Sequence, residues 1–389
     1  MDNSYRKLAI LALATLCLLG IRTAVSAAAA TTADTPAATS SRTARSKSTT
    51  RRVVNTHHRT RRTRHAREPW YLSSYGDPSL DDNPAGEDPL IRQAALNALG
   101  KLTGSIVVVD PNNGRILSIV NQKLALSNGF TPCSTFKPLV ALAALREGIV
   151  TPSTKLYVGN RTRMDMTDAL AHSNNVYFLK LGEMLGFNRI TEYAQEFGLG
   201  EKAGLDLPGE SAGRYPSAPP KQGGVGFLAY CGTDVEVTAL QMAALIAAIA
   251  NGGTLYALQY PRTPEEISAF QPVVRRQLEN LAEYIPQIHD GLAGSVLYGT
   301  GRSAYDPDFS IYGKTGTCSE NGARLGWFAS FAGELHPQYV AVVLLRGGRM
   351  MYGPHAAEIA GHFYRDLLLK EHPPQQAISV GLQQTETGR

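Results

Sequence analysis

Strand-like segments occur near both ends of the body of this chain, with a long helical stretch between them. Runs of β-branched residues are typical of strands, and apolar residues at three- and four-residue spacing are typical of helices. The helical spacing runs from Phe136 to about Ile249. The predicted strands are Gly104–Asp110, Arg115–Val120, Ile311–Thr317, Leu325–Phe331 and Tyr339–Leu345. A sheet built from such distant segments favours an α+β fold over alternating βαβ units.

The segments around these strands complete one domain. Asn-Gly turn chemistry between Pro111 and Gly114 predicts a hairpin of the first two strands. Helical patterns from Leu90 to Leu102 and from Ala356 to Lys370 predict helices at the two ends of the domain. We therefore expect an antiparallel sheet flanked by helices, with an inserted helical subdomain, over residues 89–371, and a loose tail over residues 372–389.

The N-terminal residues 1–27 have the pattern of a secretory signal. Arg6 and Lys7 precede an apolar run from Leu8 to Ile21, and small residues follow up to Ala27. The run is shorter than the roughly 18 to 20 residues that cross a bilayer, so a cleaved signal is favoured over an uncleaved anchor. The body is therefore expected outside the cytoplasm, in the periplasm or cell envelope.

Residues 28–88 are predicted to be a basic disordered tether followed by a linker. Ten Lys or Arg residues and no acid lie between Arg42 and Arg67, a composition typical of disorder. Beyond residue 67 the acids outnumber the Lys and Arg residues, 31 to 25, so the body is acidic. The tether has the charge to contact a membrane surface or wall polymers, or it is a plain solvated linker. No nucleic-acid recognition module accompanies it, so nucleic acid is not an expected partner.

Ser134 and Lys137 stand three residues apart at the start of the helical block. This spacing places a hydroxyl and an amine on one face of the first helical turn. A lysine that is buried near other cations loses its proton more easily and can then activate a serine. The motif alone is weak, because the signal segment also matches it from Ser4 to Lys7.

Two further motifs follow along the chain. Ser173-Asn174-Asn175 opens another helical stretch, where Ser and Asn are also ordinary N-cap residues. Lys314-Thr315-Gly316-Thr317 lies in a strand-like run, where Gly316 would let a substrate backbone approach as an added strand. The alternative for this segment is an ordinary exposed strand.

Together the three motifs, in this order on helix, helix and strand, resemble the signature of penicillin-binding proteins and serine β-lactamases. The chain is similar to the penicillin-binding transpeptidase domain from about Leu90 to Leu369. The segments that carry the resemblance are Pro132–Pro138, Ala169–Val176, Asp206–Glu210, Thr238–Gln241, Ala250–Gly253, Gly299–Gly301 and Gly313–Thr317. The resemblance implies the penicillin-binding/β-lactamase-like fold and a serine acyl-transferase acting on D-Ala-D-Ala stem peptides in peptidoglycan synthesis.

The resemblance also implies roles for individual residues. Ser134 would be the nucleophile, Lys137 its base, and Ser173 a proton relay toward the leaving amine. The backbone N–H groups of Ser134 and Thr317 would form the oxyanion hole, which acts on charge that develops in the transition state.

On the substrate side, the resemblance implies that Asn175 binds the substrate amide and that Lys314 shapes the electric field. Thr315 and Thr317, on either side of Gly316, would hold the terminal carboxylate. No cofactor or metal is implied, and β-lactams are expected as covalent inhibitors.

Three cysteines remain once the signal segment is removed, and export favours disulfides. The resemblance implies that Cys133, before the nucleophile, and Cys318, after the Lys-Thr-Gly-Thr run, lie close enough to bridge. Some class A carbapenem-hydrolysing β-lactamases pair cysteines at the corresponding two places. The alternative is two buried thiols, and Cys231 would be unpaired in the bridged form.

Competing functions stay open at this point. A serine β-lactamase shares the acyl-enzyme, although no Glu-x-x-Leu-Asn segment of the class A kind lies between Ser173 and Lys314. A non-catalytic β-lactam sensor or peptidoglycan-binding module would keep the same cleft without turnover. Transpeptidation and carboxypeptidation are not separated either, because the acceptor is chosen by the shape of the cleft.

Overall fold

The computed structural model describes residues 72–127, 129–333 and 336–371. The chain divides into two compact units, residues 1–63 and 64–389, and every described residue belongs to the second unit. The predicted signal segment, the tether over residues 28–67 and the tail over residues 372–389 lie outside the described residues. Within the described ranges, no helix is both long and apolar enough to cross a membrane.

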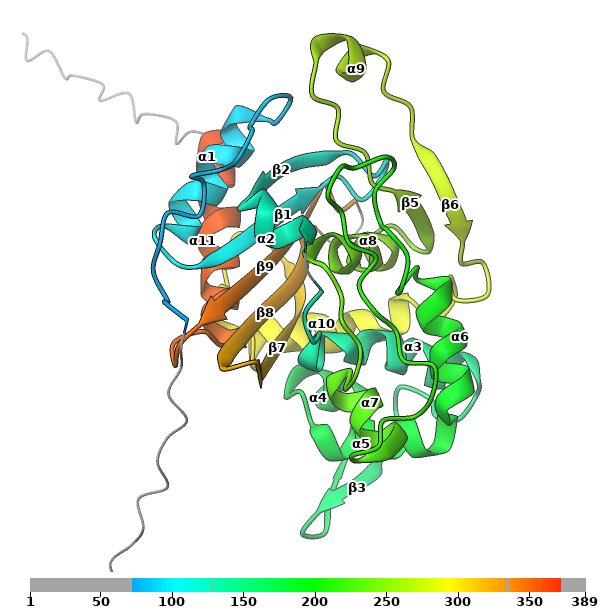
Figure 1. Cartoon of the computed structure of the whole chain (residues 1–389). Helices are drawn as coiled ribbons and strands as arrows, with labels where there is room; N and C mark the ends of the chain where they lie inside the picture. Colours follow the sequence, from blue (N-terminus) through cyan, green and yellow to red (C-terminus); the bar gives the residue numbers. More distant parts are fainter. Residues whose placement is uncertain (1–71, 128, 334–335, 372–389) are drawn as a thin grey trace, which may run out of the picture. The chain divides into compact units, whose positions relative to one another are not determined.

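A five-stranded antiparallel sheet runs through the described unit (Figure 1). Its strand order is β2-β1-β9-β8-β7, so the first and last thirds of the domain share one sheet. The bounds are β1 Gly104–Val109, β2 Ile116–Val120, β7 Ile311–Glu320, β8 Ala323–Ala332 and β9 Tyr339–Gly347. The predicted α+β class with an antiparallel sheet is confirmed.

Helices α1 (Pro89–Leu99) and α11 (Gly353–Glu371) cover one face of this sheet. Ile106 and Val108 of β1 pack on this face, whereas Val107 and Val109 belong to the core on the other face. A strand buried on both faces shows a continuous apolar run instead of alternation. This burial explains the uninterrupted apolar sequence of β1.

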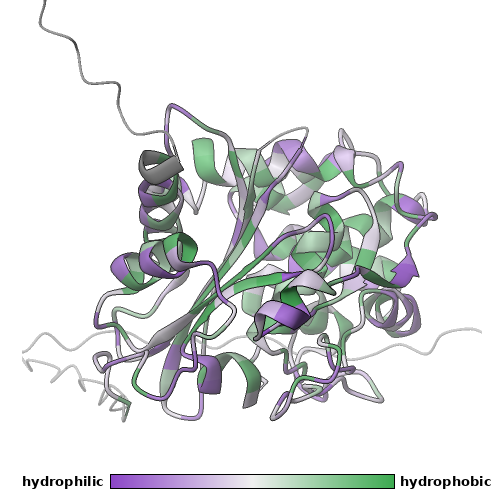
Figure 2. Ribbon diagram, turned by 90° about the horizontal axis from the view of Figure 1, so that it is seen from above, coloured by the Kyte–Doolittle hydropathy of each residue, from purple (hydrophilic) through white to green (hydrophobic). Residues whose placement is uncertain are grey.

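The helical block covers the opposite face, and Figure 2 shows hydrophobic residues along the sheet and on the helices around it. Helix α8 (Ala239–Ala250) is buried along its whole length, and a capping box of Thr238 and Gln241 satisfies its first N–H groups. The other helices are α2 Gln122–Ser127, η1 Cys133–Phe136, α3 Lys137–Arg146, α4 Met166–Ala171, α5 Asn175–Leu185, α6 Phe187–Glu196, α7 Gly224–Cys231 and α10 Pro286–Leu297.

Two small two-stranded sheets and two short helices lie outside the main sheet and the larger helices. They are the hairpin of β3 Leu156–Gly159 and β4 Thr162–Met164, the pair of β5 Thr254–Ala257 and β6 Val273–Gln277, and the short helices α9 Pro264–Ser268 and η2 Arg302–Ala304. The sequence pattern did not predict the two small sheets, because their strands are only three to five residues long.

Residues before the predicted domain start at position 89 pack against the domain. The carboxylate of Asp82 accepts hydrogen bonds from the backbone N–H groups of Asn121 and Gln122 and from the guanidinium of Arg92. Glu87 accepts from the same guanidinium and is nearly fully buried. The acidic residues that suggest a linker in the sequence therefore form buried polar contacts at residues 82 and 87.

Candidate active site

Ser134 lies half-buried on η1, a 3-10 turn that leads directly into α3. The backbone N–H of Lys137 donates to the carbonyl oxygen of Ser134, so both residues share one helical turn, as the sequence predicts. The preceding residue, Cys133, has a φ of 53°, in the left-handed region that favours glycine. A residue other than glycine keeps this conformation only where its surroundings hold it.

The side chain of Lys137 is fully buried beneath this turn. Its Nζ lies 2.7 Å from the Ser173 carbonyl oxygen, 2.7 Å from Asn175 Oδ1 and 3.1 Å from Ser173 Oγ. Burial lowers the pKa of Lys137 from 10.5 to about 7. A neutral amine there can donate to the two carbonyl-type oxygens and accept from the Ser173 hydroxyl with its lone pair.

Ser173 lies at the corner between α4 and α5, with a φ of 54°. The N-cap of α5 is Asn174, whose side chain accepts from the backbone N–H of Tyr177. Capping therefore occupies the middle residue of the Ser-Asn-Asn motif. The two outer residues, Ser173 and Asn175, remain available to contact Lys137.

Lys314 lies on β7, which forms an edge of the sheet, and its side chain is fully buried. Its Nζ lies 3.1 Å from the carbonyl oxygen of Thr315, to which it donates. Burial, and secondarily the nearby charge of Lys137, lower the pKa of Lys314 well below its usual value. The charge of Lys137 thus disfavours the protonated form of Lys314, and β7 is the last strand of the sheet, the position at which a peptide strand can be added.

Gly316 faces the turn that carries Ser134. A Cβ atom at this position would lie 3.0 Å from the carbonyl oxygen of Pro132 and 3.2 Å from the Thr135 Cγ2 atom. The missing side chain therefore lets η1 pack closely on β7. This packing is a second reason for glycine here, and the prediction that Gly316 admits a substrate backbone along β7 stays a prediction.

The side chains of Thr315 and Thr317 lie on the opposite side of β7 from Gly316. Thr315 is buried, and its hydroxyl lies 2.6 Å from the hydroxyl of Thr300. Thr317 is exposed, and its hydroxyl accepts from the backbone N–H of Gly353 at 2.7 Å. Thr317 is the more accessible of the two to a substrate. Sequence reasoning missed Thr300, although it stands in the matched Gly299–Gly301 segment.

Cys133 and Cys318 form a disulfide with their Cα atoms 5.7 Å apart. This is the pair that the resemblance implied, and it ties η1 to β7. Cys231, at the end of α7, is free. Burial raises the pKa of the Cys231 thiol, and the charge of Lys137 acts in the opposite direction. Sequence reasoning did not foresee that this thiol would lie near the buried lysine.

The residues described above place two serines and a lysine amine in one part of the domain. A half-buried serine hydroxyl stands one turn before an amine whose pKa is close to neutral, and that amine touches a second serine. Such a set can transfer protons without histidine during acyl transfer. Among the described residues, no group of three or more His, Cys, Asp or Glu side chains is arranged to hold a metal ion.

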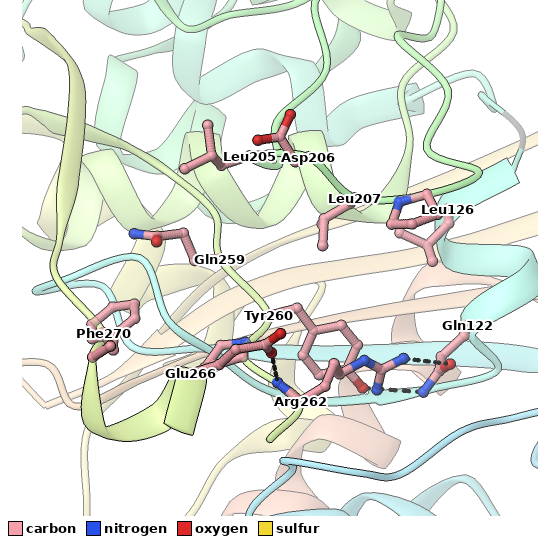
Figure 3. A pocket seen from close by; sticks show the side chains of 13 residues that line it. Gln122, Leu126, Leu205, Asp206, Leu207, Gln259, Tyr260, Arg262, Glu266 and Phe270 are labelled. Atoms are coloured by element: carbon pink, nitrogen blue, oxygen red, sulfur yellow. Dashed lines mark hydrogen bonds between the residues drawn. The ribbon is translucent and has the colours of Figure 1, made fainter. Parts of the chain in front are cut away.

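A separate cavity of about 680 Å³ lies between the segment around Leu205 and the segment from Gln259 to Phe270, which contains α9 (Figure 3). The guanidinium of Arg262 stacks on the ring of Tyr260 at 3.9 Å and donates to the carbonyl oxygen of Asn83. None of the predicted site residues lines this cavity. Its size alone therefore does not make it the reaction site.

Comparison with known proteins gives a consistent family match. The sequence profile described as "Penicillin binding protein transpeptidase domain" matches residues 104–365. Stage V sporulation protein D of Bacillus subtilis (strain 168) is 30% identical over 317 residues, which cover 67% of this chain and 48% of the relative. Peptidoglycan D,D-transpeptidase FtsI of Escherichia coli (strain K12) is 24% identical over 319 residues, covering 72% and 53%. The chain spans about half the length of the curated relatives it matches.

Solved structures share the fold at low sequence identity. The transpeptidase domain of penicillin-binding protein 3 from Burkholderia pseudomallei superposes with a TM-score of 0.64 at 22% identity, covering 76% of this chain and 98% of that chain. The D,D-transpeptidase domain of a peptidoglycan glycosyltransferase from Eggerthella lenta gives a TM-score of 0.61 at 21% identity, covering 73% and 82%.

Proposed function

The chain belongs to the penicillin-binding protein transpeptidase family, and on that premise we propose that it forms an acyl-enzyme on Ser134 with the D-Ala-D-Ala end of a peptidoglycan stem peptide. The observation that carries the proposal is the buried Lys137, whose pKa near 7 makes a base of an amine one turn from the serine. The names of the relatives point to the same reaction class.

In the acylation step, Ser134 Oγ attacks the carbonyl carbon of the penultimate D-Ala, and its proton passes to neutral Lys137. The tetrahedral oxyanion accepts hydrogen bonds from the backbone N–H groups of Ser134 and Thr317. The C–N bond then breaks, and the proton passes from Lys137 through Ser173 to the departing amine of the last D-Ala. The 3.1 Å contact between the lysine Nζ and the Ser173 hydroxyl supports this route.

Substrate binding uses the edge of β7 and the start of α5. The donor peptide adds alongside β7, its amide contacts Asn175, and its terminal carboxylate is held at Thr317, with Thr315 behind it. Lys314 contributes a positive potential when it is protonated. The exposed side chain of Thr317 supports its direct role, and the buried contact of Thr315 with Thr300 supports an indirect one.

The acyl-enzyme is released by an amine of a second stem peptide or by water, which gives D,D-transpeptidation or D,D-carboxypeptidation. The reaction takes place outside the cytoplasm, where the Cys133–Cys318 disulfide persists. β-Lactams acylate the same serine as covalent inhibitors. The basic segment before residue 67 contacts the membrane or the wall.

Labelling with a fluorescent penicillin tests the nucleophile. The wild-type protein is expected to take up one label per chain, and Ser134→Ala none, because the variant lacks the atom that forms the ester. The matched control is Ser217→Ala, which changes an exposed serine without a hydrogen bond to any described residue. Full labelling of Ser134→Ala would reject the assignment.

The fate of the label separates the rival functions. A slowly lost label together with D-Ala release from a D-Ala-D-Ala pentapeptide supports the proposed enzyme, whereas rapid loss of label identifies a β-lactamase. A stable label without D-Ala release identifies a sensor. Adding an acceptor amine to the pentapeptide reaction then distinguishes a transpeptidase from a carboxypeptidase by the product formed.

A further inference from the structure

Thr131 stands three residues before the nucleophile, and two residues of the sheet bind all of its polar groups. Its backbone N–H donates to Glu320 Oε2 at 3.0 Å, and its hydroxyl donates to the same oxygen at 2.6 Å. Its carbonyl oxygen accepts from Trp327 Nε1 at 3.0 Å. We call this set of three residues, Thr131, Glu320 and Trp327, the Thr131 clamp.

Both partners of Thr131 belong to strands of the sheet. Glu320 is the last residue of β7 and pairs with Ala323 across a two-residue turn. The turn residues Asn321 and Gly322 have φ values of 48° and 72°, as a tight hairpin of this kind requires. Trp327 is fully buried in β8. The acceptor and the donor that hold Thr131 therefore belong to the same hairpin.

We propose that Glu320 is a positioning residue for Ser134, acting through Thr131. The proposal rests on the function proposed above. Cys133 lies between Thr131 and Ser134 and has left-handed backbone geometry, so a displaced Thr131 changes the path of the chain into the turn. The Ser134 hydroxyl and backbone N–H would then move together, and acyl transfer depends steeply on such placement.

The disulfide and the clamp tie the same short segment to β7. The bridge joins Cys133 to Cys318, and the clamp joins Thr131 to Glu320, two residues further along the strand. When one of the two restraints is removed, the other still limits the movement of this segment. Their effects on acylation are therefore coupled, which is expected for groups that share one element.

The test compares acylation of the full chain by a fluorescent penicillin in Glu320→Ala and Glu320→Gln. Alanine removes the acceptor, and the limiting acylation rate is expected to fall about 10- to 100-fold with little change in non-covalent affinity. Glutamine keeps an acceptor oxygen, so it should restore most of the rate. Glu358→Ala removes an exposed acid on α11 and serves as the charge control.

A second comparison repeats Glu320→Ala in a Cys318→Ser background, where its effect on the rate should exceed that in the bridged protein. If Glu320→Ala does not fold, Thr131→Val removes the 2.6 Å hydrogen bond while keeping the shape of the side chain, and its limiting rate should fall as well.

Three results overturn the proposal: a wild-type limiting rate in the variant that folds, a loss confined to non-covalent affinity, or equal effects of Ala and Gln at position 320. A wild-type protein that takes up no penicillin would instead reject the proposed function itself. The two failures are therefore distinguishable in one set of assays.

Discussion

On the face of the sheet covered by α1 and α11, the buried side chains are mostly aliphatic and aromatic, among them Ile106, Val343 and Phe363. On the opposite face, β7 buries Lys314, and the turn packed against it leads into the buried Lys137. All five of these side chains are fully or almost fully removed from solvent. The core on this opposite face is also largely apolar, so the two faces differ in the two buried lysines and not in depth of burial.

This difference shows which buried groups stabilise the fold and which destabilise it. Burial of apolar surface stabilises the fold by about 25 cal/mol per Å², whereas burial of an amine penalises its charged form. The site face also contains the left-handed residues Cys133 and Ser173. We infer that the apolar cores on both faces supply the free energy that offsets the cost of holding the two buried lysines and the left-handed residues in place.

The largest effect is expected from Lys137→Met. Acylation should fall by about 100- to 10,000-fold, the usual contribution of a general base. In the wild-type protein, acylation should rise with pH through about 7, because the pKa of Lys137 lies there and only the neutral amine accepts a proton. Pre-steady-state penicillin labelling between pH 5 and 9 measures both effects, and a wild-type rate in the variant would reassign the base.

The same variant has the opposite effect on stability. Between pH 7 and 10.5 the unfolded wild-type chain binds a proton that the folded chain releases, so its unfolding free energy rises with pH over this window. Below pH 7 both states bind the proton, and the full penalty remains. Lys137→Met lacks this penalty, so it should be more stable than the wild type at pH 6 and show a shallower pH dependence in denaturant unfolding.

Phe363→Ala probes the other face. Phe363 is fully buried on α11, and truncating such a side chain costs about 3 to 5 kcal/mol of unfolding free energy. Because Phe363 lies ten residues along α11 from Gly353, the residue that contacts Thr317, the folded fraction should acylate at the wild-type rate. Leu80→Ala, at an exposed leucine, is the control and should leave stability nearly unchanged. A large loss of acylation in folded Phe363→Ala would mean that the faces are not separate.

The apolar pattern predicted the architecture well but not where each element ends. The β1–β2 hairpin and strands β8 and β9 lie within a few residues of their predicted bounds. Strand β7 continues to Glu320, beyond the predicted end at Thr317, because the Asn321-Gly322 turn comes later. Helix α1 ends at Leu99, where Gly100 has a positive φ. Polar strand ends and caps carry no apolar period, so the pattern could not locate them.

The motifs indicated which residues meet at the site but not how each is held. Ser134 and Lys137 share one helical turn, and Lys137 contacts Ser173, whereas their catalytic roles stay predictions. The contact of Thr315 with Thr300 and the clamp on Thr131 depend on tertiary packing between segments far apart in the chain. No local pattern in a single sequence contains that information.

Breaking the Cys133–Cys318 disulfide should have an intermediate effect. Cys318→Ser is expected to cost about 2 to 5 kcal/mol of unfolding free energy, the usual range for a native bridge. It should also slow acylation, because Cys133 is then freer to leave its left-handed conformation. Cys231→Ser is the matched control for stability and should leave the unfolding free energy nearly unchanged, since this thiol is outside the bridge. Chemical denaturation and penicillin labelling of both variants check the prediction.

The smallest effect is expected from deleting residues 28–67, the predicted basic tether, which lies outside the described residues. The contacts that define the site all come from residues 131–353, so acylation of small β-lactams should be unchanged. Binding to anionic vesicles or wall fragments should weaken, and the difference from the full chain should shrink as salt is added, because exposed charges are screened. The matched control replaces the ten basic residues of this segment with Gln or Ser at full length. If this full-length variant loses binding but keeps its acylation rate, the binding depends on the charge of the segment.

A large fall in acylation after the deletion would show instead that residues 28–67 support the active site.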